Sequence, residues 1–360
     1  MPTVLEIDRA DIGTTRLAES PAEPLDDAQV RVRIDRLAVT ANTVTYALAG
    51  DMLGYWDFFP TGDARWGRVP AMGWAEVVES RAAGVAEGTR VFGWFPLADE
   101  VVFTATATAD GFRDDGAHRR AHAPVYRAYR ASDRDRWYQG PELEDRHALL
   151  RGLFLTGFLA DEWFADAGAE PYLGAEQVVV VSASSKTAVG YAQRASRRDG
   201  LAVVGLTSPG NAGFVEGLGF YDRVVPYDEV GSIDVVPSVS IDMAGSGTVR
   251  AALHRHLDGV LRHAMTVGLS HGEVDFAPVA HGPQPEMLFA PTEVERRMAE
   301  WGGQEYDRRT TQALFDFVAD SERWLQVETS WGPDAVAETW RAVHAGEVPP
   351  DVGRITGHRG

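Results

Sequence analysis

The sequence predicts an α/β protein with two domains, one rich in β-strands and one built on a doubly wound parallel sheet. The chain has 360 residues, more than a single hydrophobic core usually supports. Roughly the first 110 residues contain segments in which apolar and polar residues alternate, as in half-buried strands. After about residue 175, apolar runs alternate with helical patterns, which is typical of βαβ units.

The β-rich domain is predicted from three segments. Residues 28–40, AQVRVRIDRLAVT, alternate with a period of two, and GWAEVVES and GTRVFGWFP are two further strand-like segments. Residues 110–139 are rich in arginine and show little periodicity, so we expect a long excursion over the surface. We place this domain at residues 1–140 and expect residues 285–360 to return to it.

The second domain is expected over residues 141–284. It starts with a predicted helix over 141–168, which has Pro141 and acidic residues near its start and Gly168 at its end. The run EQVVVVSA predicts a strand that is buried on both faces of a parallel sheet. A helical segment, SKTAVGYAQRASRRDG, then leads to further strands at LAVVGLTS, YDRVVPYD, VSIDMAG and HAMTVGLS.

Charge and composition exclude several classes of function. The net charge of −19 argues against binding to nucleic acids or anionic membranes, which require basic patches. The chain has no cysteine, so disulfides and zinc sites with thiolate ligands are excluded. The chain shows neither a secretory signal nor an apolar run long enough to cross a membrane, so we expect a cytoplasmic protein.

The segment SASSKTAVG contains Lys186, the only lysine among 34 basic residues. It lacks the glycines of a P-loop. Two interpretations remain: a solvent-exposed lysine at a helix start, or a strand-to-helix turn that binds the pyrophosphate of a dinucleotide. We prefer the second, because a neutral position in this chain would be expected to carry arginine. Most positions at which such a turn usually has glycine carry other residues here. The candidate cofactor-binding residues are Ser184, Ser185, Lys186, Thr187 and Gly190.

The end of the next predicted strand indicates which dinucleotide is bound. An NAD site usually places an acidic residue there, on the ribose hydroxyls. The segment GLTSPGN has none, and Ser208 and Asn211 are uncharged donors compatible with a 2′-phosphate. We therefore expect NADP(H), the alternative being a polar turn that binds no ligand.

The order of these parts resembles the medium-chain dehydrogenase/reductase superfamily, in particular its zinc-independent quinone oxidoreductase and enoyl reductase branch. The segments LAVTANTVTYALAG, GVAEGTRVFG and IDMAGSGTV carry this resemblance. In addition, GYWDFFP, SASSKTAVG and LFAPTEVERRMAEWG resemble a subfamily known only as a domain of unknown function. The resemblance implies a GroES-like substrate domain, a Rossmann-type NADP-binding domain, a small-molecule substrate and a homodimer.

The sequence departs from the zinc-dependent relatives. Those proteins carry a cysteine and a Gly-His-Glu motif in the first domain, whereas this chain has GWAE in the corresponding region and its first histidine is His118. We therefore expect no catalytic metal.

The resemblance also implies site residues. Asn42 stands where the branch has an asparagine that lines the nicotinamide and substrate cleft, and Tyr46 is a candidate proton donor. The aromatic residues of MLGYWDFFP either line an apolar pocket or hold their loop to the core. The candidate substrate-binding residues are Tyr55, Trp56, Phe59 and His271, and Gly245 and Gly268 are expected beside the nicotinamide.

These features lead to one preferred function and two alternatives. The preferred function is an NADP(H)-dependent, zinc-independent reductase of an activated C=C or C=O bond in a quinone, an enone or an enoyl thioester. The first alternative is a redox-inactive nucleotide-binding or scaffold protein of the same fold. The second is a lyase in which Lys186 is the catalytic amine.

Overall fold

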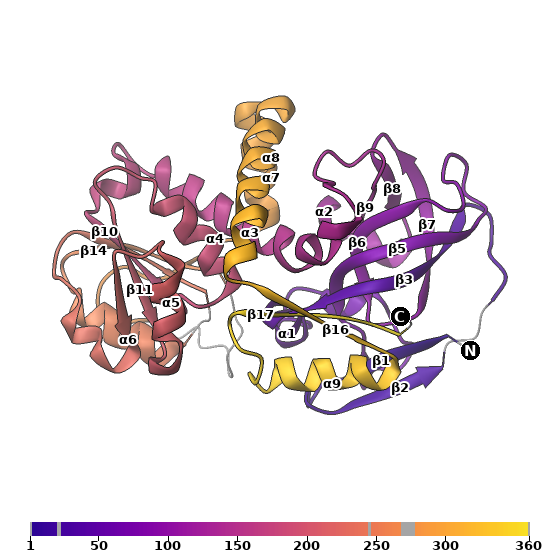
Figure 1. Ribbon diagram of the computed structural model, residues 1–360, viewed down its shortest axis with the longest axis horizontal. Helices are drawn as coiled ribbons and strands as arrows, with labels where there is room; N and C mark the ends of the chain where they lie inside the picture. Colours follow the sequence, from indigo (N-terminus) through magenta and orange to yellow (C-terminus); the bar gives the residue numbers. More distant parts are fainter. Residues whose placement is uncertain (1, 20–22, 244–245, 268–277, 359–360) are drawn as a thin grey trace. The chain divides into compact units, whose positions relative to one another are not determined.

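The chain divides into two units. The computed structural model describes residues 2–19, 23–243, 246–267 and 278–358. The first unit comprises residues 1–151 and 325–360, and the second comprises residues 152–324. Helix α3 (Glu144–Ala165) begins in the first unit and ends in the second (Figure 1).

The first unit is built on a sheet whose strand order is β16-β17-β3-β5-β6-β9-β8-β7. Because β7 also pairs with β3, the strands from β3 to β7 close into a ring. Alternate residues of β3 are buried, which confirms the strand predicted over 28–40. The elements of this unit are β1 (Thr3–Asp8), β2 (Thr15–Glu19), β3 (Gln29–Val39), α1 (Ala41–Leu48), η1 (Tyr55–Phe58), β4 (Trp66–Gly67), β5 (Pro70–Ser80), β6 (Arg90–Pro96), β7 (Glu100–Thr108), β8 (Gly111–Asp114), η2 (Ala117–Arg119), α2 (Pro124–Arg127), β9 (Ala128–Ala131), η3 (Pro141–Leu143), β16 (Gln326–Trp331), α9 (Pro333–His344) and β17 (Val352–Gly357).

Residues 110–139 differ from their prediction. We expected a surface excursion, but this segment supplies β8 and β9 to the ring of strands. Tyr129 of β9 is buried and stacks on Phe112 of β8 at 4.8 Å. The charged residues that obscured the pattern form ion pairs, such as Arg113 with Asp115 at 2.8 Å.

The second unit contains a parallel sheet with the strand order β12-β11-β10-β13-β14-β15. Strand β10 carries the four valines and is buried along its whole length, so the predicted doubly wound sheet is confirmed. The other elements of this unit are η4 (Pro171–Gly174), β10 (Gln177–Val181), α4 (Lys186–Ala195), β11 (Ala202–Thr207), η5 (Pro209–Asn211), α5 (Ala212–Leu218), β12 (Arg223–Pro226), η6 (Tyr227–Ser232), β13 (Ser238–Asp242), α6 (Gly247–His256), β14 (Leu261–Thr266), β15 (Glu286–Met287), α7 (Ala290–Trp301), α8 (Gly303–Asp320) and η7 (Ser321–Arg323).

The boundaries of the units differ from those expected. We expected the chain to return to the β-rich domain at residue 285, and in the structure it returns at residue 325. The segment between these positions packs within the second unit. Strand β15 pairs with β14, and Phe317 of α8 stacks on Phe154 of α3 at 4.9 Å.

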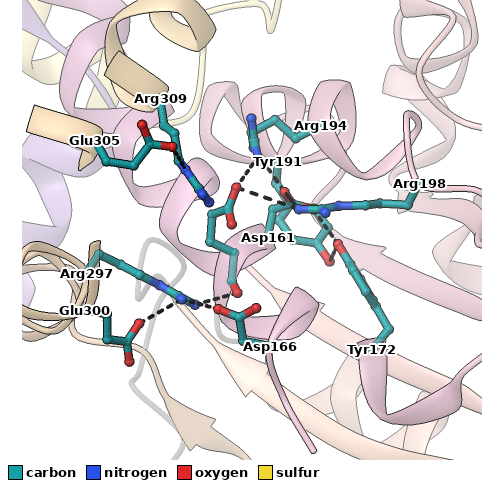
Figure 2. Close-up of polar contacts among 11 residues, drawn as sticks. Asp161, Asp166, Tyr172, Tyr191, Arg194, Arg198, Arg297, Glu300, Glu305 and Arg309 are labelled. Atoms are coloured by element: carbon teal, nitrogen blue, oxygen red, sulfur yellow. Dashed lines mark hydrogen bonds and ion pairs between the residues drawn. The ribbon is translucent and has the colours of Figure 1, made fainter. Parts of the chain in front are cut away.

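Helices α3 and α4 are held together by polar side chains that surround the buried carboxylate of Asp161 (Figure 2). Asp161 of α3 is fully buried and accepts hydrogen bonds from the Tyr172 hydroxyl at 2.6 Å, from Nε of Arg194 at 3.0 Å and from Nε of Arg198 at 3.2 Å. The Tyr191 hydroxyl donates in turn to the Tyr172 hydroxyl at 3.3 Å. We call these five residues the Asp161 cluster. Its carboxylate charge is compensated by two guanidinium groups.

A fully buried guanidinium, that of Arg297, lies beside this cluster in Figure 2. Arg297 of α7 has no exposed surface and pairs with Asp166 and Glu300. It also donates to the backbone carbonyl of Glu162 in α3. This contact helps to fix α7 against the second half of α3.

Candidate active site

The turn after β10 lies at the carboxyl edge of the parallel sheet in the second unit. Its first residue, Ser182, has a φ of 60°, in the left-handed region that favours glycine. The Ser182 hydroxyl lies 3.0 Å from the hydroxyl of Tyr227, and the Tyr221 hydroxyl donates to the carbonyl of Ala183 at 2.9 Å. Ser182 thus adopts, without being glycine, a backbone conformation that glycine usually supplies.

Helix α4 begins at Lys186, directly after this turn. The side chain of Ser185 caps the helix and accepts the N–H of Ala188 at 3.2 Å. Lys186 and Thr187 form the first turn, where backbone N–H groups lack intrahelical partners and the helix dipole is positive. The predicted residues Ser185, Lys186 and Thr187 therefore lie where an anion is favoured.

The ends of β10 and β11 are joined by side chains. The amide of Asn211 donates to the Ser184 hydroxyl at 3.1 Å, and the hydroxyl of Thr207 lies 3.5 Å from the same oxygen. Ser208 follows Thr207 and is half-buried. Three of the predicted cofactor-binding residues, Ser184, Ser208 and Asn211, thus lie at one edge of the sheet.

Gly190 lies inside α4, and its contacts are with other helices. A Cβ atom at this position would lie 3.3 Å from the ring of Phe154 and 3.5 Å from that of Phe317. A Cβ atom at Gly157 of α3 would lie only 2.7 Å from the backbone nitrogen of Tyr191. Both glycines therefore allow α3 and α4 to approach each other closely.

Three other predicted residues lie outside the described residues. They are Gly245, Gly268 and His271.

In the first unit, Asn42 and Tyr46 lie one turn apart on α1. Tyr46 is buried, and Nε1 of Trp94 donates to its hydroxyl at 3.2 Å. The ring of Tyr46 contacts that of Tyr55 at 4.7 Å and that of Tyr126 at 6.3 Å, both edge to face. The hydroxyls of Tyr55 and Tyr126 are 3.4 Å apart. We call these five residues the Tyr46 cluster.

Burial controls the acidity of the phenols in this cluster. Desolvation, followed by the electrostatic effect of Tyr55, raises the pKa of Tyr46 to about 12. Hydrogen bonding of its hydroxyl with Asn42, Trp94 and Tyr126 acts in the opposite direction and lowers the pKa. Burial also raises the pKa of Tyr126 well above its ordinary value. All three phenols are therefore neutral at pH 7.

The other aromatic residues of the 52–60 segment pack within the first unit. Trp56 lies so close to the backbone that a Cβ atom at Gly50 or Gly67 would come within 2.3 Å of its ring. Phe59 lies under the guanidinium of Arg119, at 5.2 Å from its Cζ atom. Of the three predicted aromatic residues, only Tyr55 belongs to the Tyr46 cluster.

Sequence analysis missed four residues of these two regions. Trp94 lies in a predicted strand, and Tyr126 lies in the segment that was interpreted as a surface excursion. Ser182 gives no signal in the sequence, because serine seldom takes the left-handed conformation. Tyr227 follows β12 and lies inside the predicted segment YDRVVPYD, which gave no sign of a role for its side chain.

Across the ranges that the structure describes, no group of three or more His, Asp or Glu side chains could hold a metal ion. None of the helices in those ranges combines the length and the apolar character needed to cross a bilayer.

A GroES-like β-rich domain joined to a Rossmann domain defines the fold of the medium-chain dehydrogenase/reductase superfamily, and this chain has that fold. Solved structures of this type match it over nearly its whole length at low sequence identity. CurA from Vibrio vulnificus in complex with NADPH is 12% identical, with a TM-score of 0.64 over 100% of both chains. The quinone oxidoreductase from Coxiella burnetii is 13% identical, with a TM-score of 0.57 over 99% of both chains. A mutant form of enoyl thioester reductase from Candida tropicalis is 12% identical, with a TM-score of 0.57 over 99% of both chains.

The chain belongs to the family described as "Protein of unknown function (DUF2855)", whose model matches residues 37–349. This confirms the subfamily to which the sequence motifs pointed. No curated protein matches the chain in sequence.

Proposed function

We propose that this protein is an NADP(H)-dependent, zinc-independent reductase of an activated C=C or C=O bond in an apolar small molecule such as a quinone, an enone or an enoyl thioester. The observation that carries the proposal is the turn after β10. It combines a left-handed Ser182 with a helix that begins at Lys186, at the carboxyl edge of a doubly wound sheet. The resemblance of the fold to CurA, which was solved with NADPH, supports the same class of cofactor.

The residues at this edge fit a phosphorylated dinucleotide. The start of α4 suits a pyrophosphate, and Lys186 supplies a compact positive charge on a flexible stem. The segment after β11 offers Ser208 and Asn211 and no carboxylate that would repel a 2′-phosphate. Tyr227, beside Ser182, adds a further hydroxyl donor.

The Tyr46 cluster is the proposed site of proton transfer. When bound, the reduced nicotinamide would supply a hydride to the substrate. We assign Tyr46 as the proton donor, because its phenol is neutral at pH 7 and enclosed by other donors. An amide has two N–H groups, so Asn42 can hold the Tyr46 oxygen with one and a substrate oxygen with the other. Tyr55 is the proposed contact with an apolar substrate.

Nucleotide binding tests the cofactor assignment. We expect NADPH to bind more tightly than NADH, measured by isothermal titration calorimetry. Replacing Lys186 with alanine should weaken NADPH binding about tenfold or more, at least about 1.4 kcal/mol. The control variant is Arg223→Ala, which removes a cation from an exposed ion pair of the same unit. Equal affinity of wild type and Lys186→Ala would remove the phosphate-binding role of this lysine.

The single lysine allows a second test that needs no substrate. Pyridoxal phosphate followed by borohydride labels lysine amines, and mass spectrometry distinguishes Lys186 from the N-terminal amine. We expect NADPH to protect Lys186 and NADH to protect it less. If neither NADPH nor NADH changed the extent of labelling at Lys186, the proposed site would be contradicted.

Turnover separates the preferred function from its alternatives. Wild type should oxidise NADPH with at least one compound in a panel of quinones, enones and enoyl thioesters. A stable NADPH complex without turnover would support the redox-inactive alternative. A substrate trapped on Lys186 by borohydride would support the lyase. The homodimer stays a prediction, which light scattering can test.

A further inference from the structure

Side chains from three separate elements of the first unit surround the hydroxyl of Tyr46. Trp94 of β6 donates to it at 3.2 Å, the ring of Tyr126 of α2 packs edge to face on that of Tyr46 at 6.3 Å, and Asn42 lies one turn earlier on α1. Each of these side chains favours the deprotonated phenol, since each lowers the pKa of Tyr46. The side chains that act on Tyr46 are therefore arranged to stabilise a negative charge on its oxygen.

We infer that Tyr126 and Trp94 are positioning residues that stabilise the Tyr46 phenolate formed when Tyr46 gives its proton to the substrate. This inference rests on the proposed function of Tyr46 as proton donor. It assigns to two residues outside α1 the role that an oxyanion hole plays for a substrate oxygen. In this case the stabilised oxygen is that of Tyr46, the proton donor, and not an oxygen of the substrate.

Proton transfer from Tyr46 breaks one bond and forms another. A bound reduced nicotinamide would supply a hydride to the electron-poor atom of the activated double bond, which would leave negative charge at the other end of the conjugated system. The O–H bond of Tyr46 breaks and its proton forms a C–H or O–H bond there, while the electron pair stays on the Tyr46 oxygen. Water then returns a proton to the phenolate and completes the cycle.

Tyr126 is suited to this role because its single proton has two acceptors. Its hydroxyl lies 3.4 Å from that of Tyr55, its ring packs on that of Tyr46 at 6.3 Å, and its hydroxyl lowers the pKa of Tyr46. A hydroxyl donates one proton, so it serves one of the two oxygens at a time. A hydrogen bond to a charged oxygen is about twice as strong as one to a neutral oxygen, so the proton turns toward Tyr46 once the phenolate forms. The contact is then stronger in the transition state than in the resting protein, as catalysis requires.

The buried guanidinium of Arg119 donates to the backbone carbonyl of Tyr126, whereas the groups that act on the Tyr46 hydroxyl itself are uncharged. The groups that act on its hydroxyl within the described residues are two phenols, an indole and an amide, all neutral at pH 7. Two of them, Tyr55 and Tyr126, are themselves titratable, and burial raises the pKa of both. They therefore stay protonated while Tyr46 reacts.

The test is a titration of residue 46 in the protein without nucleotide. Fluorotyrosine, which is more acidic than tyrosine, is incorporated at position 46 alone, and fluorine NMR follows its ionisation. We expect Tyr126→Phe and Trp94→Phe each to raise the pKa of this phenol by about 0.5–1 on the pH scale, since each removes one hydrogen bond. The control is Tyr138→Phe, because Tyr138 donates to Glu144 outside the cluster.

Kinetics provide the second readout. Tyr126→Phe should lower kcat about ten- to a hundredfold, less than the loss of a sole oxyanion donor because Trp94 and Asn42 remain. KM and NADPH affinity should stay unchanged, and Tyr126→Phe should cause no further loss in a Tyr46→Phe background.

The two proposals fail in different ways. An unchanged pKa at position 46 in both Tyr126→Phe and Trp94→Phe overturns this inference, even if wild type reduces enones. Absence of NADPH binding overturns the proposed function, even if the titration behaves as expected. If one variant does not fold, as judged by circular dichroism, the other decides.

Discussion

The Tyr46 cluster and the Asp161 cluster each surround a buried polar side chain and contain tyrosines whose hydroxyls contact one another, yet they differ in charge. Asp161 carries a full negative charge and accepts from two guanidinium groups and one phenol at 2.6–3.2 Å (Figure 2). Tyr46 carries no charge in the resting protein, and Trp94 donates to its hydroxyl at 3.2 Å. In the Asp161 cluster the hydrogen-bond donors meet a charge that is always present.

This difference separates a structural role from a functional one. Donors around a permanent charge lower the free energy of the folded state at all times, so their loss appears in stability. Hydrogen bonds to a neutral phenol become stronger only when negative charge develops on its oxygen, so the loss of such a donor lowers kcat. The variants below test this distinction, starting with the largest expected effect.

Tyr46→Phe should have the largest effect, and on activity rather than stability. We expect kcat to fall about a hundred- to ten-thousandfold, the usual contribution of a positioned proton donor. The free energy of unfolding should fall by about 1 kcal/mol, the net value of one ordinary hydrogen bond. Steady-state kinetics and urea unfolding measure the two quantities. A variant that keeps wild-type kcat would place the proton donor elsewhere.

Asp161→Asn should show the reverse pattern. Loss of the carboxylate removes the fully buried partner of Arg194 and Arg198, which keep Glu162 as a second partner, so we expect the free energy of unfolding to fall by about 1.5–3 kcal/mol. The matched control is Asp316→Asn, which breaks an exposed pair with Arg197 at 3.8 Å and should cost less than about 1 kcal/mol. Equal losses in both variants would contradict the structural role of the Asp161 cluster.

The sequence predicted the second unit better than the first, and the reason is physical. The four valines of β10 and the turn that follows them are local signals, because strand, turn and helix start are adjacent in the chain. Asn42 and Tyr46 were also proposed from one local segment, in which they stand four residues apart. Trp94 and Tyr126 reach Tyr46 from other elements 48 and 80 positions further along the chain, and no local pattern encodes such a contact.

The interpretation of residues 110–139 failed for a related reason. Their many charged residues concealed the strands, because a charge count does not show which charges are paired. Arg127 and Arg113 both pair with Asp115, so these charges stabilise the segment and do not mark it as a solvated loop. Tyr126 was missed as a consequence.

The pH dependence of stability gives the next effect in size. The pKa of Tyr46 is raised from 10.0 to about 12 in the folded protein, so the folded state holds this proton more tightly than the unfolded state. This stabilisation is complete below pH 10 and is lost as the pH rises to about 12, a change of about 2–3 kcal/mol. Tyr46→Phe should therefore make unfolding less sensitive to pH in this range. The free energy of unfolding of both proteins is measured in urea over this pH range. If it fell equally in wild type and variant, the burial of a neutral phenol would be contradicted.

The smallest expected effect concerns the two peripheral tyrosines, Tyr191 and Tyr126. Each belongs to its cluster through hydroxyl contacts with other tyrosines, Tyr191 with Tyr172 at 3.3 Å and Tyr126 with Tyr55 at 3.4 Å. Tyr191→Phe should cost about 1 kcal/mol of stability and leave kcat unchanged, because Asp161 keeps its three donors. Tyr126→Phe should cost about the same stability but also lower kcat. The same chemical change is thus made in two similar surroundings, and only at Tyr126 does it remove a donor to a charge that develops during the reaction. Equal kcat values for the two variants would show that Tyr126 has a structural role only.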